Sequence, residues 1–246
     1  MSLLDHIYIV LVATTHPGNI GAAARAMKNM GLSHLRLVQP KHFPCAEATE
    51  RASGADDVLA QAQIFDSLAA SIQDCHLVMG TSARSRRIAW PLLTPKACAE
   101  KVLQTQGKVA LLFGREHAGL TNEELDQCHY MIQIPTNPQF SSLNVAAAVQ
   151  VFTYELYSQS LMLRAFQPEK TLLEHSMVSQ AQMAQFYEHL EQTLIEISFF
   201  NPEKPKLLKR RLQRLFNRAQ LEQAEMNILR GILTTVQQKC HSSKQK

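Results

Sequence analysis

The sequence lacks the glycine-rich fingerprints of the common nucleotide-binding folds. No G-x-G-x-x-G follows an apolar run that could form a strand, and no G-x-x-x-x-G-K-[ST] occurs anywhere in the chain. Both patterns bring a backbone turn close to phosphate groups. Their absence disfavours a nicotinamide-dependent dehydrogenase and excludes a P-loop nucleotidase.

Cysteine is scarce, and long apolar runs are missing. The five cysteines are scattered without a C-x-x-C pair, and the ten histidines show no metal-ligand spacing. This usage favours a reducing compartment and argues against a zinc site. The apolar run over 7–13 is far too short to span a bilayer, and the N-terminal segment lacks the features of a signal peptide. We therefore expect a cytoplasmic protein that binds no metal ion and no membrane.

The apolar residues follow a pattern typical of an α/β fold. Hydrophobic residues make up 46% of the chain, enough for a sizeable core. Buried parallel strands are predicted over 7–12, 35–38, 77–80, 109–113 and 130–134. Helices are predicted near 20–30, 56–62, 68–72, 95–103, 121–127 and 142–157. Such alternation predicts a parallel sheet with helices on both faces.

The chain is predicted to divide into two domains. The segment over 163–176 contains a proline and has no clean period, which is typical of a linker. Three helices are predicted after it, near 178–197, 205–218 and 221–239. We expect one domain over 1–162 and a small all-α domain over 177–246.

Positive charge is concentrated in the second part of the chain. Residues 1–169 hold 13 Lys+Arg against 14 Asp+Glu, a net charge of −1, whereas residues 170–246 hold 12 against 7, a net charge of +5. A basic appendage on a nearly neutral body indicates a polyanionic partner. A helical face exposed to solvent, with no partner, would explain scattered lysines about as well.

The first of three glycine-bearing loops follows the strand predicted over 7–12. It reads Pro17-Gly18-Asn19-Ile20-Gly21 and leads into a helix that carries Arg25. Asn19 can cap that helix, and the glycines allow close approach of the backbone. An arginine within two turns of a helix N-terminus suits a phosphate or a ribose. An ordinary turn with a surface arginine explains the pattern equally well.

Two further loops follow later strands. One places the pair Arg115-Glu116 between two glycines directly after a buried strand, which is costly to maintain without a purpose. A tight turn with an exposed ion pair is the alternative. The other loop runs from Ile134 to Ser141-Ser142-Leu143-Asn144 and opens a long helix. Its serines and asparagine either cap that helix or bind a ligand.

Together the loops match a family pattern. N-x-G-x-x-x-R over 19–25, F-G-x-E-x-x-G-L over 113–120 and I-P…S-x-L-N over 134–144 resemble, in order and spacing, the three motifs of the SPOUT-superfamily RNA 2'-O-ribose methyltransferases. The stretches over 80–86, 137–140 and 227–233 are similar to those of the bacterial tRNA (cytidine/uridine-2'-O-)-methyltransferases that act at position 32 of the anticodon loop. The resemblance covers nearly the whole chain.

The resemblance implies a cofactor, an assembly and a set of site residues. It implies a deep trefoil knot in the sheet domain, S-adenosyl-L-methionine as methyl donor, tRNA as substrate, and a homodimer whose active sites are shared between subunits. Arg25 is expected at the reacting ribose, where it would orient the 2'-hydroxyl, and Asn19 and Ser142 are the other expected catalytic residues. Ser142 and Asn144 are candidate polar partners of the ligand, and Glu116 is expected mainly to organise its loop. The expected cofactor-binding residues are Thr81, Ser82, Ala83, Gly114, Glu116, Gly119, Leu120, Ile134, Ser141, Ser142, Leu143 and Asn144.

Contacts to RNA are expected from two basic groups. Arg84, Arg86 and Arg87 lie in one loop, and the helix near 205–218 places Leu208, Leu212, Leu215 and Phe216 on one face. The basic residues expected on its outer side are Lys209, Arg210, Arg211, Arg214 and Arg218. Two other functions fit the same motifs. One is methylation of another tRNA or rRNA ribose, and the other is RNA binding without catalysis.

Overall fold

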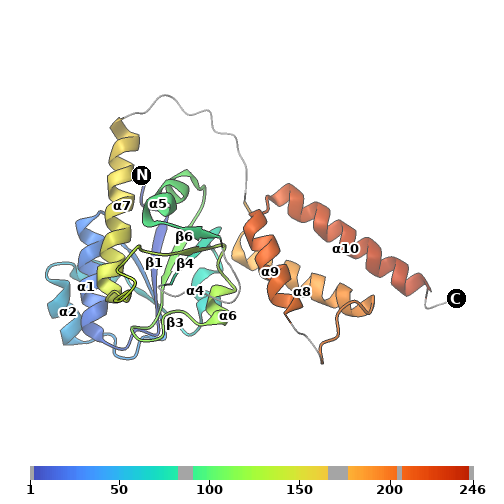
Figure 1. Ribbon diagram of the computed structural model, residues 1–246, viewed down its shortest axis with the longest axis horizontal. Coiled ribbons are helices and arrows are strands. Elements are labelled where there is room, and N and C mark those ends of the chain that lie inside the picture. The colour runs from blue at the N-terminus through green and yellow to red at the C-terminus, as the bar shows by residue number, and fades with distance from the viewer. Residues whose placement is uncertain (1–2, 83–90, 166–176, 204–206, 244–246) are drawn as a thin grey trace. The chain divides into compact units, whose positions relative to one another are not determined.

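The computed structural model describes residues 3–82, 91–165, 177–203 and 207–243. The chain forms two compact units, Met1–Leu172 and Leu173–Lys246 (Figure 1). Four residues with predicted functions, Ala83, Arg84, Arg86 and Arg87, lie outside the described residues. No helix among those described is both long enough and apolar enough to cross a membrane.

A parallel sheet forms the centre of the first unit. In the described residues it has seven strands in the order β3-β2-β1-β6-β4-β7-β5, and every neighbouring pair is parallel. The strands are β1 Ile7–Val12, β2 His34–Val38, β3 Gln63–Phe65, β4 Leu77–Thr81, β5 Leu92–Leu93, β6 Val109–Phe113 and β7 Tyr130–Ile132. The predicted parallel α/β fold is confirmed.

Helices cover both faces of the sheet, as predicted. They are α1 Pro17–Asn29, α2 Ala46–Ala52, α3 Asp56–Ala60, α4 Leu68–Ile72, α5 Pro95–Gln104, α6 Asn122–Leu125 and α7 Val145–Ala165 (Figure 1). Along β1, Ile7 and Ile9 join one apolar cluster with α1, α5 and α7. Val10 and Val12 join a second cluster with α4 and α6. Strands buried on both faces explain why the sequence shows continuous apolar runs.

The helix ends refine the sequence predictions. Helix α1 begins at Pro17, and its N-cap is His16 without a side-chain hydrogen bond. The prediction that Asn19 caps this helix is therefore wrong, because proline already favours the first helical position. Helix α7 begins at Val145, later than predicted, and Asn144 caps it by accepting hydrogen bonds from the Ala146 and Ala147 amides at 2.9 and 3.4 Å.

The second unit contains α8 Gln180–Glu196, α9 Leu208–Ala219 and α10 Gln223–Ser243. Its core contains Val178, Met183, Phe186, Leu221, Met226 and Leu233. Leu215 is 47% exposed, so its predicted place on the buried face of α9 is wrong. Phe216 lies on the packed face as predicted, with its ring edge-on against Phe186. The same face includes the buried Asn217, which accepts a 2.7 Å hydrogen bond from the Tyr187 hydroxyl.

Candidate active site

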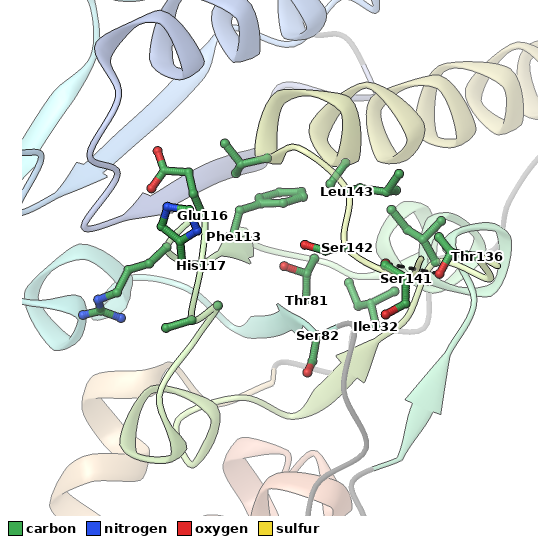
Figure 2. Close-up of a pocket in the computed structure, with 17 residues that line it drawn as sticks. Thr81, Ser82, Phe113, Glu116, His117, Ile132, Thr136, Ser141, Ser142 and Leu143 are labelled. Atoms are coloured by element: carbon green, nitrogen blue, oxygen red, sulfur yellow. Dashed lines mark hydrogen bonds between the residues drawn. The ribbon is translucent and has the colours of Figure 1, made fainter. Parts of the chain in front are cut away.

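A cavity lies where β4, β6 and β7 end, and it includes about 210 Å³ that water can reach. Thr81 and Ser82 come from the end of β4, Phe113 to Gly119 from the end of β6, and Ile132, Ile134 and Thr136 from β7 and beyond. Ser141, Ser142 and Leu143 close the wall before α7. Figure 2 shows these side chains converging on a common space. The carboxyl edge of a parallel sheet is the usual place for a ligand site.

Nine of the predicted cofactor-binding residues line this cavity. They are Thr81, Ser82, Gly114, Glu116, Gly119, Ile134, Ser141, Ser142 and Leu143. Leu120 is buried in the apolar cluster below the cavity, and Asn144 caps α7. These two residues support the wall without forming it.

Glycine is required at position 114 because two backbone segments meet there. A Cβ atom on Gly114 would lie 2.1 Å from the carbonyl carbon of Gly119 and 2.2 Å from the amide nitrogen of Leu120. Arg115 and Gly119 exchange backbone hydrogen bonds of 3.2 and 2.8 Å, and Gly119 has a φ of +68°. The loop therefore closes on itself and presents backbone groups to the cavity.

Glu116 binds the loop between β1 and α1. Its carboxylate accepts hydrogen bonds from the Thr15 hydroxyl at 2.9 Å, the His16 amide at 3.1 Å and the Asn19 side-chain amide at 2.9 Å. Burial opposes ionisation, but the hydrogen bonds from Asn19, His16 and Thr15 outweigh it and lower the pKa of Glu116 to about 2. In Figure 2 the carboxylate points away from Thr81 and Ser82. Glu116 is thus suited to organising a loop.

The lowered pKa of Glu116 predicts an acid-sensitive contribution to stability. A group whose pKa is lower in the folded state than the ordinary 4.5 stabilises the fold fully above that value and loses the contribution as the pH falls toward about 2. Glu116→Gln should therefore flatten the fall of the unfolding free energy between about pH 5 and pH 2. Denaturant titrations at several pH values measure this, and identical acid profiles for both proteins would contradict it.

A chain of side chains joins the three loops. The Asn144 amide donates a 2.9 Å hydrogen bond to the Asn19 side-chain oxygen, and the Asn19 amide donates to Glu116 at 2.9 Å. Asn19 therefore connects the second loop to the start of α7. Of the three predicted catalytic residues only Ser142 lines the cavity, and Arg25 is exposed on α1.

Several lining residues were not named individually in the sequence prediction. Arg115, His117 and Ala118 line the cavity from within the predicted loop over 114–120, and Phe113, Ile132, Thr136, Val145 and Ala148 line it as well. Most of them lie between or beside predicted residues, so proximity to the motifs was the available signal. Arg115 also supports the loop, because its guanidinium binds both Glu124 oxygens at 3.0 Å and Glu124 forms the capping box of α6 with Thr121.

The basic residues of α9 are not equally available. Arg211 and Arg218 are exposed, whereas Arg210 and Arg214 are half-buried. Lys209 is exposed but forms a 2.6 Å ion pair with Glu191 of α8. The basic surface that α9 exposes to solvent therefore includes fewer of the five predicted residues than the sequence indicated. No cluster of three or more potential metal ligands occurs in the described residues.

Comparison with known proteins finds similarity over almost the whole chain. Residues 6–154 match the SpoU rRNA Methylase family, and residues 181–246 match the C-terminal domain of the tRNA methyltransferase TrmJ. The tRNA (cytidine/uridine/adenosine-2'-O-)-methyltransferase TrmJ of Pseudomonas aeruginosa is 53% identical over 244 residues, which cover 96% of this chain and 95% of that protein. The tRNA (cytidine/uridine-2'-O-)-methyltransferase TrmJ of Pectobacterium atrosepticum is 49% identical and covers 96% and 98%.

A solved structure is similar as well. The crystal structure of TrmJ from Z. mobilis ZM4 superposes with a TM-score of 0.82 at 36% sequence identity. The alignment covers 94% of this chain and 98% of that chain.

Proposed function

The chain belongs to the SpoU rRNA Methylase family, and on that premise we propose where on tRNA it acts and how its residues divide the work. It is a tRNA 2'-O-ribose methyltransferase that uses S-adenosyl-L-methionine and acts on cytidine or uridine. We assign its target to position 32 of the anticodon loop and its place of action to the cytoplasm. The observation that carries the proposal is the gathering of the second and third loops and the end of β4 around one cavity, to which the first loop is joined through the hydrogen bonds of Asn19.

The cavity fits the methyl donor in shape and chemistry. The absence of a Cβ at Gly114 lets its loop close against the backbone of Gly119 and Leu120, and Gly114 and Gly119 both line the cavity. The wall combines apolar side chains, among them Ile132 and Leu143, with the hydroxyls of Thr81, Ser82 and Ser142. Such a lining suits an adenine ring beside polar ribose and amino-acid groups. Bound there, the cofactor supplies a methyl group already activated by its sulfonium.

The chemical task of the protein is to position a poor nucleophile. The 2'-hydroxyl must align with the methyl group and lose its proton during attack, and alignment alone can supply much of the rate enhancement. A guanidinium keeps its charge in proteins and is a poor base. We assign to Arg25 the grip on the phosphate beside the target ribose, with proton removal assisted by that phosphate. Ser142 is the polar contact within the cavity.

We propose that the enzyme is a homodimer in which Arg25 serves the cavity of the partner subunit. Arg25 is exposed on α1 and does not line the cavity of its own chain. The neighbouring helix α7 exposes large apolar side chains: Tyr154, Tyr157, Leu161, Met162 and Leu163. Tyr154, Tyr157 and Leu161 follow the i, i+3, i+7 spacing of one helix face, and an exposed apolar face of this kind favours self-association through a two-fold interface.

We also propose a knotted chain. Strand β7 lies between β4 and β5, which both precede it in sequence. The chain enters the sheet there and continues through residues 133–144 into α7. This order supports a deep trefoil knot, an exception to the usual rule against threaded loops.

The basic C-terminal domain, residues 177–246 after a linker over 163–176, is assigned to tRNA binding, with Arg84, Arg86 and Arg87 of the first domain. Arg211 and Arg218 are its exposed arginines on α9. Replacing both by alanine should weaken tRNA binding and reduce the slope of log K against log salt by about 2, since each phosphate contact contributes about 1. Filter binding over a salt series measures the slope, with Arg51→Ala on α2 as the control. An unchanged slope would exclude these contacts.

Mapping ribose methylation in tRNA tests the function directly. Cells that lack the protein should lose the 2'-O-methyl group at position 32 and regain it from a plasmid copy. Loss of a methyl group only in rRNA, or at another tRNA ribose, would show that the protein methylates that ribose and not position 32. Calorimetry with S-adenosyl-L-methionine separates catalysis from RNA binding alone, because a non-catalytic protein need not retain the cofactor.

A further inference from the structure

Phe140 is the most exposed large apolar side chain in the described residues, with 81% of its surface accessible. An ordered turn holds it there. The Phe140 amide donates a 2.9 Å hydrogen bond to the Asn137 carbonyl, and the Gln139 amide donates to the Asn137 side-chain oxygen at 3.0 Å. Leaving a phenyl ring in water forfeits the free energy of its burial. A fixed, solvent-facing ring therefore suits a partner that covers it.

The turn lies at the rim of the cavity. Phe140 directly precedes Ser141 and Ser142, which line the wall, and Thr136 lines it from the other side of the turn. The Thr136 hydroxyl donates a 3.2 Å hydrogen bond to the Ser141 carbonyl, so the two ends of the turn are tied together. Figure 2 shows Thr136, Ser141 and Ser142 on one side of the cavity. The ring is thus presented beside the place where the methyl donor is assigned.

The proposed substrate supplies a partner of suitable chemistry. Cytidine and uridine differ on their pairing edges, since cytosine has an amino donor where uracil has a carbonyl acceptor. A site that accepts both bases cannot depend on that edge. The flat π-face is common to all bases, and aromatic side chains bind it with little sequence preference. Bases in a single-stranded loop can be unstacked and offered to such a ring.

Resting on the proposed function, we infer that Phe140 stacks on the base of the target nucleotide. Stacking fixes the orientation of the base and therefore the direction of the glycosidic bond. The 2'-hydroxyl of the attached ribose is thereby held toward the cavity. Phe140 is a residue that binds the substrate and takes no part in proton transfer. Its effect should appear in kcat/KM for tRNA and leave cofactor affinity unchanged.

Substitutions at Phe140 and in the target base test the inference together. Phe140→Ala should lower kcat/KM for tRNA by about 10-fold to 100-fold, the range for loss of one base–aromatic stack. Phe140→Trp should retain activity, whereas Phe140→Leu, apolar but without a π-face, should behave like the alanine variant. Gln139→Ala is the matched control, because it removes an exposed side chain from the same turn and should match the wild type.

A tRNA with an abasic site at the target position identifies the stacked base. With this substrate, kcat/KM of the wild type should fall by the same factor as kcat/KM of Phe140→Ala falls with normal tRNA. For Phe140→Ala, removing the base should lower kcat/KM little further, because the stack is already lost. If removing the base lowered kcat/KM of Phe140→Ala by the full factor seen in the wild type, the ring would not contact that base and the inference would be overturned. So would weaker cofactor binding or dissociation into monomers in Phe140→Ala, since the ring would then support the wall or the dimer. Wild-type protein that methylates no tRNA would instead overturn the proposed function.

Discussion

Gly114→Ala is expected to abolish methyl transfer and to weaken S-adenosyl-L-methionine binding by at least about 100-fold, because the loop that forms the cavity wall must move. The added methyl group would lie 2.1 Å from a backbone carbon of Gly119. No rotation of a side chain relieves a contact with backbone, so residues 114–120 would have to separate. We expect a cost of about 1–3 kcal/mol in unfolding free energy, typical of overpacking at a tightly packed position.

The chain offers a matched control in Gly231. This glycine lies within α10, and a Cβ there would have no atom within 4 Å. Gly231→Ala should therefore stabilise the protein by about 0.5–1 kcal/mol, the gain in helix propensity. Calorimetry measures cofactor affinity for both variants, and denaturant titration measures stability. Normal cofactor binding by Gly114→Ala would show that the loop conformation seen here is not the binding conformation.

The central strands could be predicted because burial on both faces leaves an unbroken apolar run. The predicted ranges 7–12 and 109–113 coincide with β1 and β6, the two central strands of the first unit. The short strands β3 and β5 were missed, since each has at most three residues and pairs with a single neighbour. Their formation depends on that neighbour more than on their own sequence.

Helix α2 was missed for a related reason. Its buried residues are Ala48 and Ala52, which are too small to produce a clear apolar period. They pack against α1, where a Cβ on Gly21 would lie 2.0 Å from the Ala48 carbonyl oxygen. Gly21 was expected to allow close approach of the backbone in a ligand-binding loop. In the structure that closeness serves helix packing, which a glycine in a motif cannot reveal by itself.

The site was predictable at the level of loops and less so at the level of side chains. Polar and glycine residues after parallel strands meet at one edge of the sheet, so three separated motifs could be assigned to one region. The second and third motifs line the cavity, and the first is joined to them through Asn19. The direction of a side chain depends on partners that are distant in sequence. Glu116 lines the cavity, as expected of a cofactor-binding residue, but the partners through which it organises its loop, Thr15, His16 and Asn19, lie about 100 residues away in sequence.

Arg25 is the residue whose role depends most on assembly, and its removal should have an effect as large as that of Gly114→Ala. Arg25→Ala should lower kcat by at least about 100-fold, since the target ribose loses its anchor. Cofactor affinity should stay unchanged, because Arg25 is assigned to a phosphate of the tRNA and not to the cofactor. Arg25→Lys should also lose most activity if the two-pronged grip of a guanidinium is needed. Single-turnover kinetics measure the first effect and calorimetry the second, and nearly full turnover in Arg25→Lys would contradict orientation by a bidentate contact.

Mixing two inactive variants separates a shared site from a self-contained one. Ser142→Trp should fill the cavity with a large side chain and leave Arg25 intact. Because Ser142 is exposed, the substitution should not disturb the core. In a randomly reassociated equal mixture with Arg25→Ala, about half of the dimers are hybrids, and each hybrid combines one intact cavity with one intact arginine from the other subunit. Activity should therefore recover to about one quarter of the wild-type value. If each subunit used its own Arg25, every cavity would lack either space or arginine, and the mixture would stay as inactive as its components.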